Sequence, residues 1–174
     1  PRERHLARVA LDGSGAELET EVEGVHRIIW SPYATQALVT CSGPDQPPVT
    51  RLWSPERELP FPGSEETWRD YDWPEVRWET VTAPDGTLLH GRLMLPLGFD
   101  AGRRYPLIVH VYGGPHAQRV RKHWPGEDAL DQWLARHGFL VWSLDNRGSW
   151  GRGHAFETPV DRHLGEQELA DQLA

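Results

Sequence analysis

Pro106-Leu-Ile-Val-His-Val-Tyr-Gly-Gly-Pro-His-Ala-Gln118 is the stretch that decides the fold of this chain. Its first half, residues 106–111, is a short apolar run rich in β-branched side chains, which is typical of a buried parallel strand. The run leads directly into Tyr112, Gly113 and Gly114, where glycines permit a sharp turn and leave the backbone open. Ligands of open α/β sheets bind beyond the carboxyl ends of the strands. A phenol and bare amides at that place suit the stabilisation of a developing oxyanion.

The same residues have a second interpretation. Tyr112 also fits a core aromatic at the end of a strand, and the Gly-Gly-Pro that follows it then forms no more than a tight turn. Turn chemistry alone favours this second interpretation. The flanking sequence therefore has to decide between them.

The residues that follow predict a βαβ unit. Helical spacing over 128–137 ends at Gly138, a natural stop, and residues 139–144 form the next apolar run. The apolar residues on one face of this helix are Ala129, Leu130, Trp133 and Leu134. A strand, helix and strand in this order should cross over right-handed and place the two strands parallel. A Gly-rich loop over 145–158 and another helix from about residue 164 complete the pattern.

The residues before this unit favour β structure. A hairpin is expected where 77–81 and 88–95 flank Pro84-Asp85-Gly86. Further upstream, short strands are expected at 5–11, 26–30, 36–41 and 49–53. Their spacing fits a β-propeller blade and a β-sandwich equally well.

Residues 105–118 resemble the start of the catalytic domain of dipeptidyl peptidase IV-like serine peptidases, in the prolyl oligopeptidase family. Further segments fit that family in order: Asp85-Gly-Thr87 with 89–93, then 143–149, then 164–172. Upstream, residues 5–13, Trp30-Ser-Pro32 and Pro47-Pro48 resemble the closing strands of its propeller. The resemblance implies an α/β fold: the end of a β-propeller over 1–58, an interdomain connection over 59–75, and the first part of an α/β-hydrolase domain over 76–174.

The resemblance also implies a function. It implies a serine peptidase that releases N-terminal X-Pro or X-Ala dipeptides from short peptides by acyl-enzyme chemistry, without a cofactor. The Tyr112 hydroxyl would donate to the oxyanion, and Gly113 and Gly114 would let the substrate approach. The Ser, Asp and His of the triad would lie beyond Ala174 and the amine-recognising glutamates before Pro1, so we expect an internal fragment that is inactive alone.

Two alternatives remain open. One is another peptidase of the same family: an oligopeptidase, a tripeptidyl peptidase or an acylaminoacyl peptidase. The other is a non-catalytic homologue that acts as a binding protein. Homodimerisation is common in the dipeptidyl type, and nothing in the sequence indicates the cellular compartment.

The remaining chemically active residues have weaker claims. Cys41 lies in an apolar strand and is expected to be buried and inert, and His116 to be a surface residue. Asp145 and Arg147 are expected to brace the Gly-rich loop through an ion pair rather than to react. Ser149 lacks the Gly-x-Ser-x-Gly spacing of a nucleophile.

Composition excludes several classes of partner. The net charge of −8 argues against nucleic acid, because phosphate binding requires clustered Lys and Arg. The nine histidines have no zinc-type spacing, so no catalytic metal is expected. No stretch approaches the roughly 20 apolar residues of a membrane-spanning helix.

Overall fold

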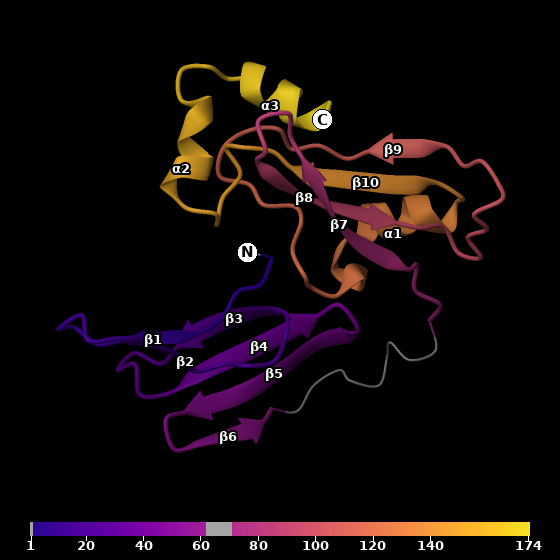
Figure 1. The fold of residues 1–174 in the computed structure, drawn as a ribbon. Helices are drawn as coiled ribbons and strands as arrows, with labels where there is room; N and C mark the ends of the chain where they lie inside the picture. Colours follow the sequence, from indigo (N-terminus) through magenta and orange to yellow (C-terminus); the bar gives the residue numbers. More distant parts are fainter. Residues whose placement is uncertain (1, 62–70) are drawn as a thin grey trace. The chain divides into compact units, whose positions relative to one another are not determined.

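The computed structural model describes residues 2–61 and 71–174, which form two compact units, one built mainly from β-strands and one from strands and α-helices (Figure 1). One unit contains 72–120 and 128–174, and the other contains the described part of 2–71 together with 121–127. The expected α/β class is confirmed, whereas the division into propeller and hydrolase stays a prediction. Part of the expected connection, residues 62–70, lies outside the described residues.

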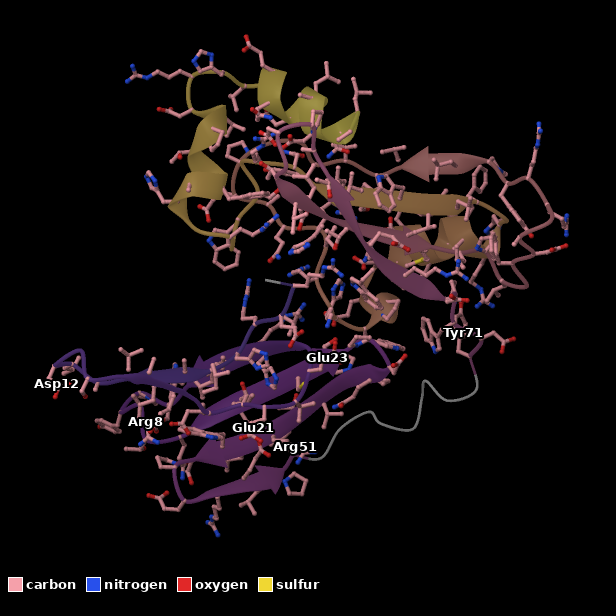
Figure 2. The ribbon with its side chains drawn as sticks, viewed as in Figure 1. Arg8, Asp12, Glu21, Glu23, Arg51 and Tyr71 are labelled. Atoms are coloured by element: carbon pink, nitrogen blue, oxygen red, sulfur yellow. The ribbon has the colours of Figure 1, made fainter. Side chains whose placement is uncertain are left out.

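The unit that contains residues 2–61 is built from antiparallel strands. Its larger sheet is a meander in chain order: β3 (Val25–Trp30), β4 (Ala37–Gly43), β5 (Gln46–Ser54) and β6 (Arg57–Pro60). A separate hairpin pairs β1 (Ala7–Val9) with β2 (Ala16–Leu18). Asp12 lies at the tip of this hairpin (Figure 2), where its carboxylate accepts a 2.9 Å hydrogen bond from the Ser14 amide, which lowers the pKa of Asp12. Each strand expected from the apolar runs is confirmed, and β2 and β6 are additions.

The unit that contains residues 72–120 holds a second sheet, in the order β7-β8-β10-β9. Its strands are β7 (Val76–Thr82), β8 (Leu88–Met94), β9 (Leu107–Val109) and β10 (Leu140–Asp145). β8 pairs antiparallel with both β7 and β10, whereas β9 and β10 are parallel, with Ile108 opposite Val141. The predicted hairpin and the predicted parallel βαβ pairing are therefore both confirmed.

Helices pack against this second sheet. The helical segments of this unit are α1 (Ala129–Arg136), α2 (His154–Glu157), η2 (Thr158–Val160) and α3 (Glu166–Gln172), whereas η1 (Pro125–Glu127) belongs to the other unit. Ala135 of α1 joins Met94 and Val141 in one buried cluster. Phe156 of α2 joins Leu89 and Leu144 in another. The alternation of side chains along β10 therefore supplies two separate cores, because Val141 and Leu144 point to opposite faces.

Helix α1 is where expected, but it buries a different face from the one that its apolar residues indicate. Leu130 and Trp133 are 59% and 55% exposed, whereas Asp131 and Gln132 are buried. A carboxylate can be buried in this way when basic side chains surround it, and Asp131 has such neighbours. The expectation that Leu130 and Trp133 lie on the buried face of this helix is thus wrong.

Residues 121–127 belong by packing to the unit that contains residues 2–61. The Trp124 amide donates to Ser42 Oγ at 2.9 Å, and Glu127 pairs with Arg27 at 2.6 Å. Lys122 continues this docking through an ion pair with Glu3 at 3.0 Å. These residues were expected in the hydrolase part, and no neighbouring sequence feature indicates their contacts with Ser42 and Arg27.

Gly91 offers a test of the packing between β8 and β10. A Cβ at Gly91 would overlap the ring of Trp142, so Gly91→Ala forces that ring to move. We expect Gly91→Ala in the full-length protein to lower the free energy of unfolding by roughly 1–3 kcal/mol, measured by thermal or denaturant unfolding. Gly15→Ala is the matched control, because its Cβ would meet open space. Equal stability of the two variants would contradict this packing.

Candidate functional site

Tyr112 lies just beyond the carboxyl end of β9. The ladder between β9 and β10 extends one residue past Val109, because the His110 amide donates to the Trp142 carbonyl at 2.7 Å. Tyr112 itself is 63% exposed, and its hydroxyl has no hydrogen-bond partner within residues 2–61 and 71–174. Such exposure contradicts the interpretation of Tyr112 as a core aromatic, while its chemical role stays a prediction.

The local geometry requires Gly113 and leaves little room for a side chain at Gly114. Gly113 has φ +78°, a conformation that side chains other than glycine rarely adopt. At Gly114 a Cβ would lie 3.3 Å from Cε1 of Tyr112 and crowd the phenol ring. His116 is exposed, and its amide donates to the Gly148 carbonyl at 3.3 Å. The structure therefore places His116 on the surface, as expected.

Asp145 tethers the far end of this loop. Its carboxylate is 3% exposed and accepts hydrogen bonds from the amides of Arg119, at 2.8 Å, and Val120, at 3.2 Å. A further bond joins the Trp150 amide to the Ala117 carbonyl at 3.3 Å. Asp145 thus holds backbone in place at the end of β10, a structural role as expected, but the expected ion pair with Arg147 is wrong, because Arg147 pairs with Asp171 and Asp85.

Arg147 braces the Gly-rich loop, as expected, but through partners that the sequence did not indicate. Its guanidinium contacts Asp171 of α3 at 2.6 Å, and its own amide donates to the same carboxylate at 2.8 Å. A second ion pair joins Arg147 to Asp85 in the β7–β8 turn. The bonds to Asp171 raise the pKa of Arg147 above its usual value, so the guanidinium is charged throughout the physiological range.

A cluster of charged side chains contacts both ends of the loop that carries Tyr112, residues 111–118. Arg92, which is 2% exposed, pairs with both Asp128 and Asp131 of α1. Asp131 also contacts His110 at 2.5 Å and Arg119 at 3.5 Å. Nothing in the sequence pairs these residues, although a carboxylate at the centre of a short amphipathic helix, Asp131, is a sign of a buried charge.

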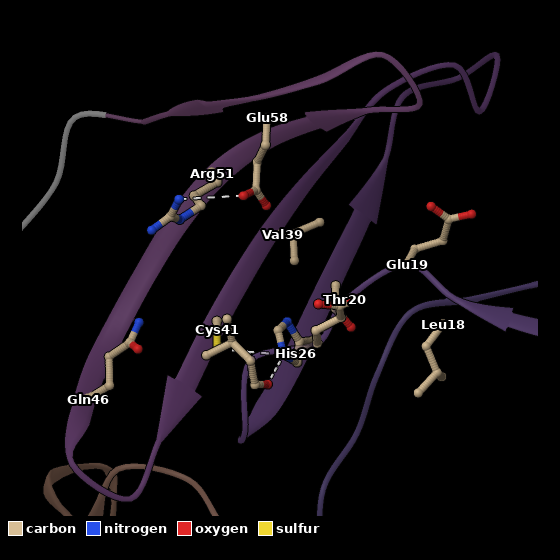
Figure 3. A pocket seen from close by; sticks show the side chains of 11 residues that line it. Leu18, Glu19, Thr20, His26, Val39, Cys41, Gln46, Arg51 and Glu58 are labelled. Carbon is tan, nitrogen blue, oxygen red and sulfur yellow. Dashed lines mark hydrogen bonds and ion pairs between the residues drawn. The ribbon is translucent and has the colours of Figure 1, made fainter.

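The unit that contains residues 2–61 carries a pocket of about 360 Å³ (Figure 3). His26 and Cys41 line it side by side, with 3.6 Å between Nε2 and Sγ, and Arg51 pairs with Glu58 at 3.4 Å across the neighbouring strands. The pKa of the Cys41 thiol is raised because burial disfavours the thiolate. Cys41 is thus buried and protonated at neutral pH, as expected for an inert cysteine.

The described residues contain neither a cluster of metal ligands nor a helix suited to a membrane. No three His, Cys, Asp or Glu side chains in residues 2–61 and 71–174 are grouped so that they could hold a metal ion. Within the same residues, no helix has the length and apolarity needed to cross a membrane.

The chain also resembles known proteins in its sequence. Residues 127–174 match the profile of the prolyl oligopeptidase family. Over 99% of this chain, "Probable dipeptidyl-aminopeptidase B" of Coccidioides posadasii is 31% identical, and the match covers 20% of that protein. The predicted family resemblance is confirmed. "Probable dipeptidyl peptidase 4" of Emericella nidulans is 29% identical over 90% of this chain and 21% of its own length.

Two solved structures from the same group of dipeptidyl peptidases share the fold. A Bacteroides ovatus protein assigned as dipeptidyl aminopeptidase IV has a TM-score of 0.76 and 38% identity, over 85% of this chain and 22% of its own. Porphyromonas gingivalis dipeptidyl peptidase 4 has a TM-score of 0.86 at 22% identity, over 99% and 25% respectively. The chain spans about a fifth of the length of the curated relatives it matches.

The tether at Asp145 can be tested by substitution. Asp145→Ala removes the acceptor of two backbone amides, so we expect the full-length protein to lose roughly 1–3 kcal/mol of unfolding free energy. Proteolytic cleavage within residues 112–120 should also become faster. Asp145→Asn retains Oδ1 as an acceptor and should lose less. If Asp145→Ala and Asp145→Asn behaved alike, the two amide bonds would not be the reason for the effect.

The turn at Asp85 predicts a dependence of stability on pH. The Thr87 amide, followed by the Arg147 guanidinium, lowers the pKa of Asp85 from 3.8 to about 2. A carboxyl whose pKa is lower in the folded state than in the unfolded state stabilises the fold at pH values above the unfolded-state pKa. This contribution is lost as the pH falls from about 4 towards 2. Melting temperatures of the full-length protein should therefore show an advantage over Asp85→Asn at pH 5 that fades across that interval. A difference that did not change between pH 5 and pH 2 would contradict this.

Proposed function

We propose that the whole protein is a serine dipeptidyl peptidase that removes N-terminal X-Pro or X-Ala dipeptides from short peptides. One observation carries the proposal: Tyr112 is exposed beyond the carboxyl end of β9, on a turn whose geometry requires Gly113 and leaves little room for a side chain at Gly114. Relatives named dipeptidyl peptidase 4 and dipeptidyl-aminopeptidase B support it. Dimerisation stays a prediction.

The domain assignment belongs to the same proposal. We assign the four-stranded meander β3–β6 to a propeller blade, because consecutive antiparallel strands in one sheet are the pattern of such blades. The sheet β7-β8-β10-β9, with helices against both faces, would begin an α/β-hydrolase domain. β9 is the last strand in this order and therefore leaves an edge at which a further strand could pair in the whole protein, and the exposed Leu107 and Val109 lie on one face of β9.

The mechanism gives Tyr112 a single role. A serine hydroxyl supplied elsewhere in the protein adds to the scissile carbonyl, and its proton passes to a histidine. The carbonyl oxygen then carries negative charge, and the Tyr112 hydroxyl donates a hydrogen bond to it. Collapse of this intermediate expels the amine, which takes the proton from the histidine, and leaves an acyl-enzyme that water hydrolyses. No residue of this chain is proposed as the nucleophile or the base.

Replacing the tyrosine tests this role. We expect Tyr112→Phe in the full-length protein to lower kcat on a Gly-Pro or Ala-Pro amide by roughly 100- to 1,000-fold, because one oxyanion donor is lost. KM should change far less, since the donor acts mainly in the transition state. Tyr33→Phe is the matched control, because Tyr33 is 89% exposed and belongs to the other compact unit. Wild-type turnover by Tyr112→Phe would refute the role.

A second measurement distinguishes the proposed peptidase from a binding protein. A fluorophosphonate probe reacts covalently with an activated serine, so the full-length protein should be labelled at one serine. Protein that folds but remains unlabelled would indicate a non-catalytic homologue instead.

A further inference from the structure

The loop that carries Tyr112 is closed at its base by side chains. The loop covers residues 111–118, so His110 and Arg119 are the residues immediately before and after it. Their side chains approach each other, with 2.9 Å between His110 Nδ1 and Arg119 Nη2. Both also contact Asp131 of α1, His110 at 2.5 Å and Arg119 at 3.5 Å. One carboxylate therefore joins the two ends of the loop.

The chemistry of this contact assigns the proton on His110. A carboxylate accepts hydrogen bonds and cannot donate them, so the 2.5 Å contact places the proton on Nδ1 of His110. That nitrogen cannot then accept from Arg119, whose acceptor in the cluster is the second oxygen of Asp131. Asp131 is 1% exposed, and buried Arg92 offsets its charge. Breaking any of these contacts leaves part of a buried charge uncompensated, which is costly.

The loop needs this external support because its own sequence is permissive. Gly113 and Gly114 give the backbone wide conformational freedom. The Tyr112 hydroxyl has no partner in the part of the chain that the structure describes. An oxyanion donor is effective only when it is held in place before the reaction. Backbone bonds at His116 and Ala117 hold the second half of the loop, so the position of the phenol in its first half depends on how the end at His110 is held.

We propose that Asp131, His110 and Arg119 are positioning residues that hold Tyr112 ready to donate to the oxyanion. This inference rests on the proposed function of Tyr112. Their proposed action is on the backbone at 111–118 rather than on the substrate itself. The role is separate from general stability, because it predicts that their effect on catalysis disappears when the Tyr112 hydroxyl is absent.

A double-mutant cycle in the full-length protein tests this prediction. His110→Leu removes the donor to Asp131, and we expect kcat to fall by roughly 10- to 100-fold with little change in KM, as for a misplaced catalytic group. In the Tyr112→Phe background the same substitution should change kcat by no more than about twofold. His110→Asn, whose side-chain amide can take the place of Nδ1–H, should recover most of the activity. His163→Leu, at a residue that is 68% exposed, is the control.

The outcomes separate this inference from the function on which it rests. Wild-type turnover by Tyr112→Phe would refute the proposed role of the tyrosine itself. If Tyr112→Phe is impaired but His110→Leu is not, or if His110→Leu costs the same factor in both backgrounds, the positioning role alone is wrong. If His110→Leu does not fold, Arg119→Gln replaces it in the same cycle, because it removes the other contact at the base of the loop. A loss confined to the background with Tyr112 would support the proposal.

Discussion

A buried carboxylate determines how β8, β9 and α1 meet. Asp131 is 1% exposed and contacts Arg92 from β8, His110 from the end of β9 and Arg119 from the loop beyond it. Removing one partner of such a pair typically costs roughly 3–5 kcal/mol, because an uncompensated charge stays buried. The charge therefore penalises every arrangement in which these elements separate. It also explains why α1 turns Leu130 and Trp133 towards the outside.

The central strand β10 provides the rest of the platform. It carries an apolar core on each face, and it ends in Asp145, which binds the backbone at residues 119 and 120. Arg147, two residues later, binds Asp171 and so connects the strand to α3. Buried polar groups thus lie at the carboxyl ends of β9 and β10. Ligand sites in open α/β sheets lie at such ends, since the scaffold there is rigid and the loops are variable.

The sequence predicted local structure well and distant pairings poorly. Apolar runs and turn residues located β9, α1 and β10, and they placed Tyr112, Gly113 and Gly114 together beyond a strand. The partners of Asp131 could not be predicted, because Arg92 and His110 lie 39 and 21 residues away and nothing local links them. The same applies to residues 121–127, whose docking depends on Ser42 and Arg27. The apolar periodicity of α1 indicated the wrong buried face, because it takes no account of Asp131, whose charge is paired with Arg92 and His110.

The docking of residues 121–127 also constrains the order of events during translation. The bond from Trp124 to Ser42 joins residues 82 apart, and the pair of Arg27 and Glu127 joins residues 100 apart. A ribosome that adds about 5–20 residues per second needs about 5–20 seconds to synthesise the longer of these intervals. Until then, the meander that has already emerged lacks the segment that binds Ser42 and Arg27. The first sheet of the nascent chain therefore stays without its contacts to residues 121–127 until that later segment has been synthesised.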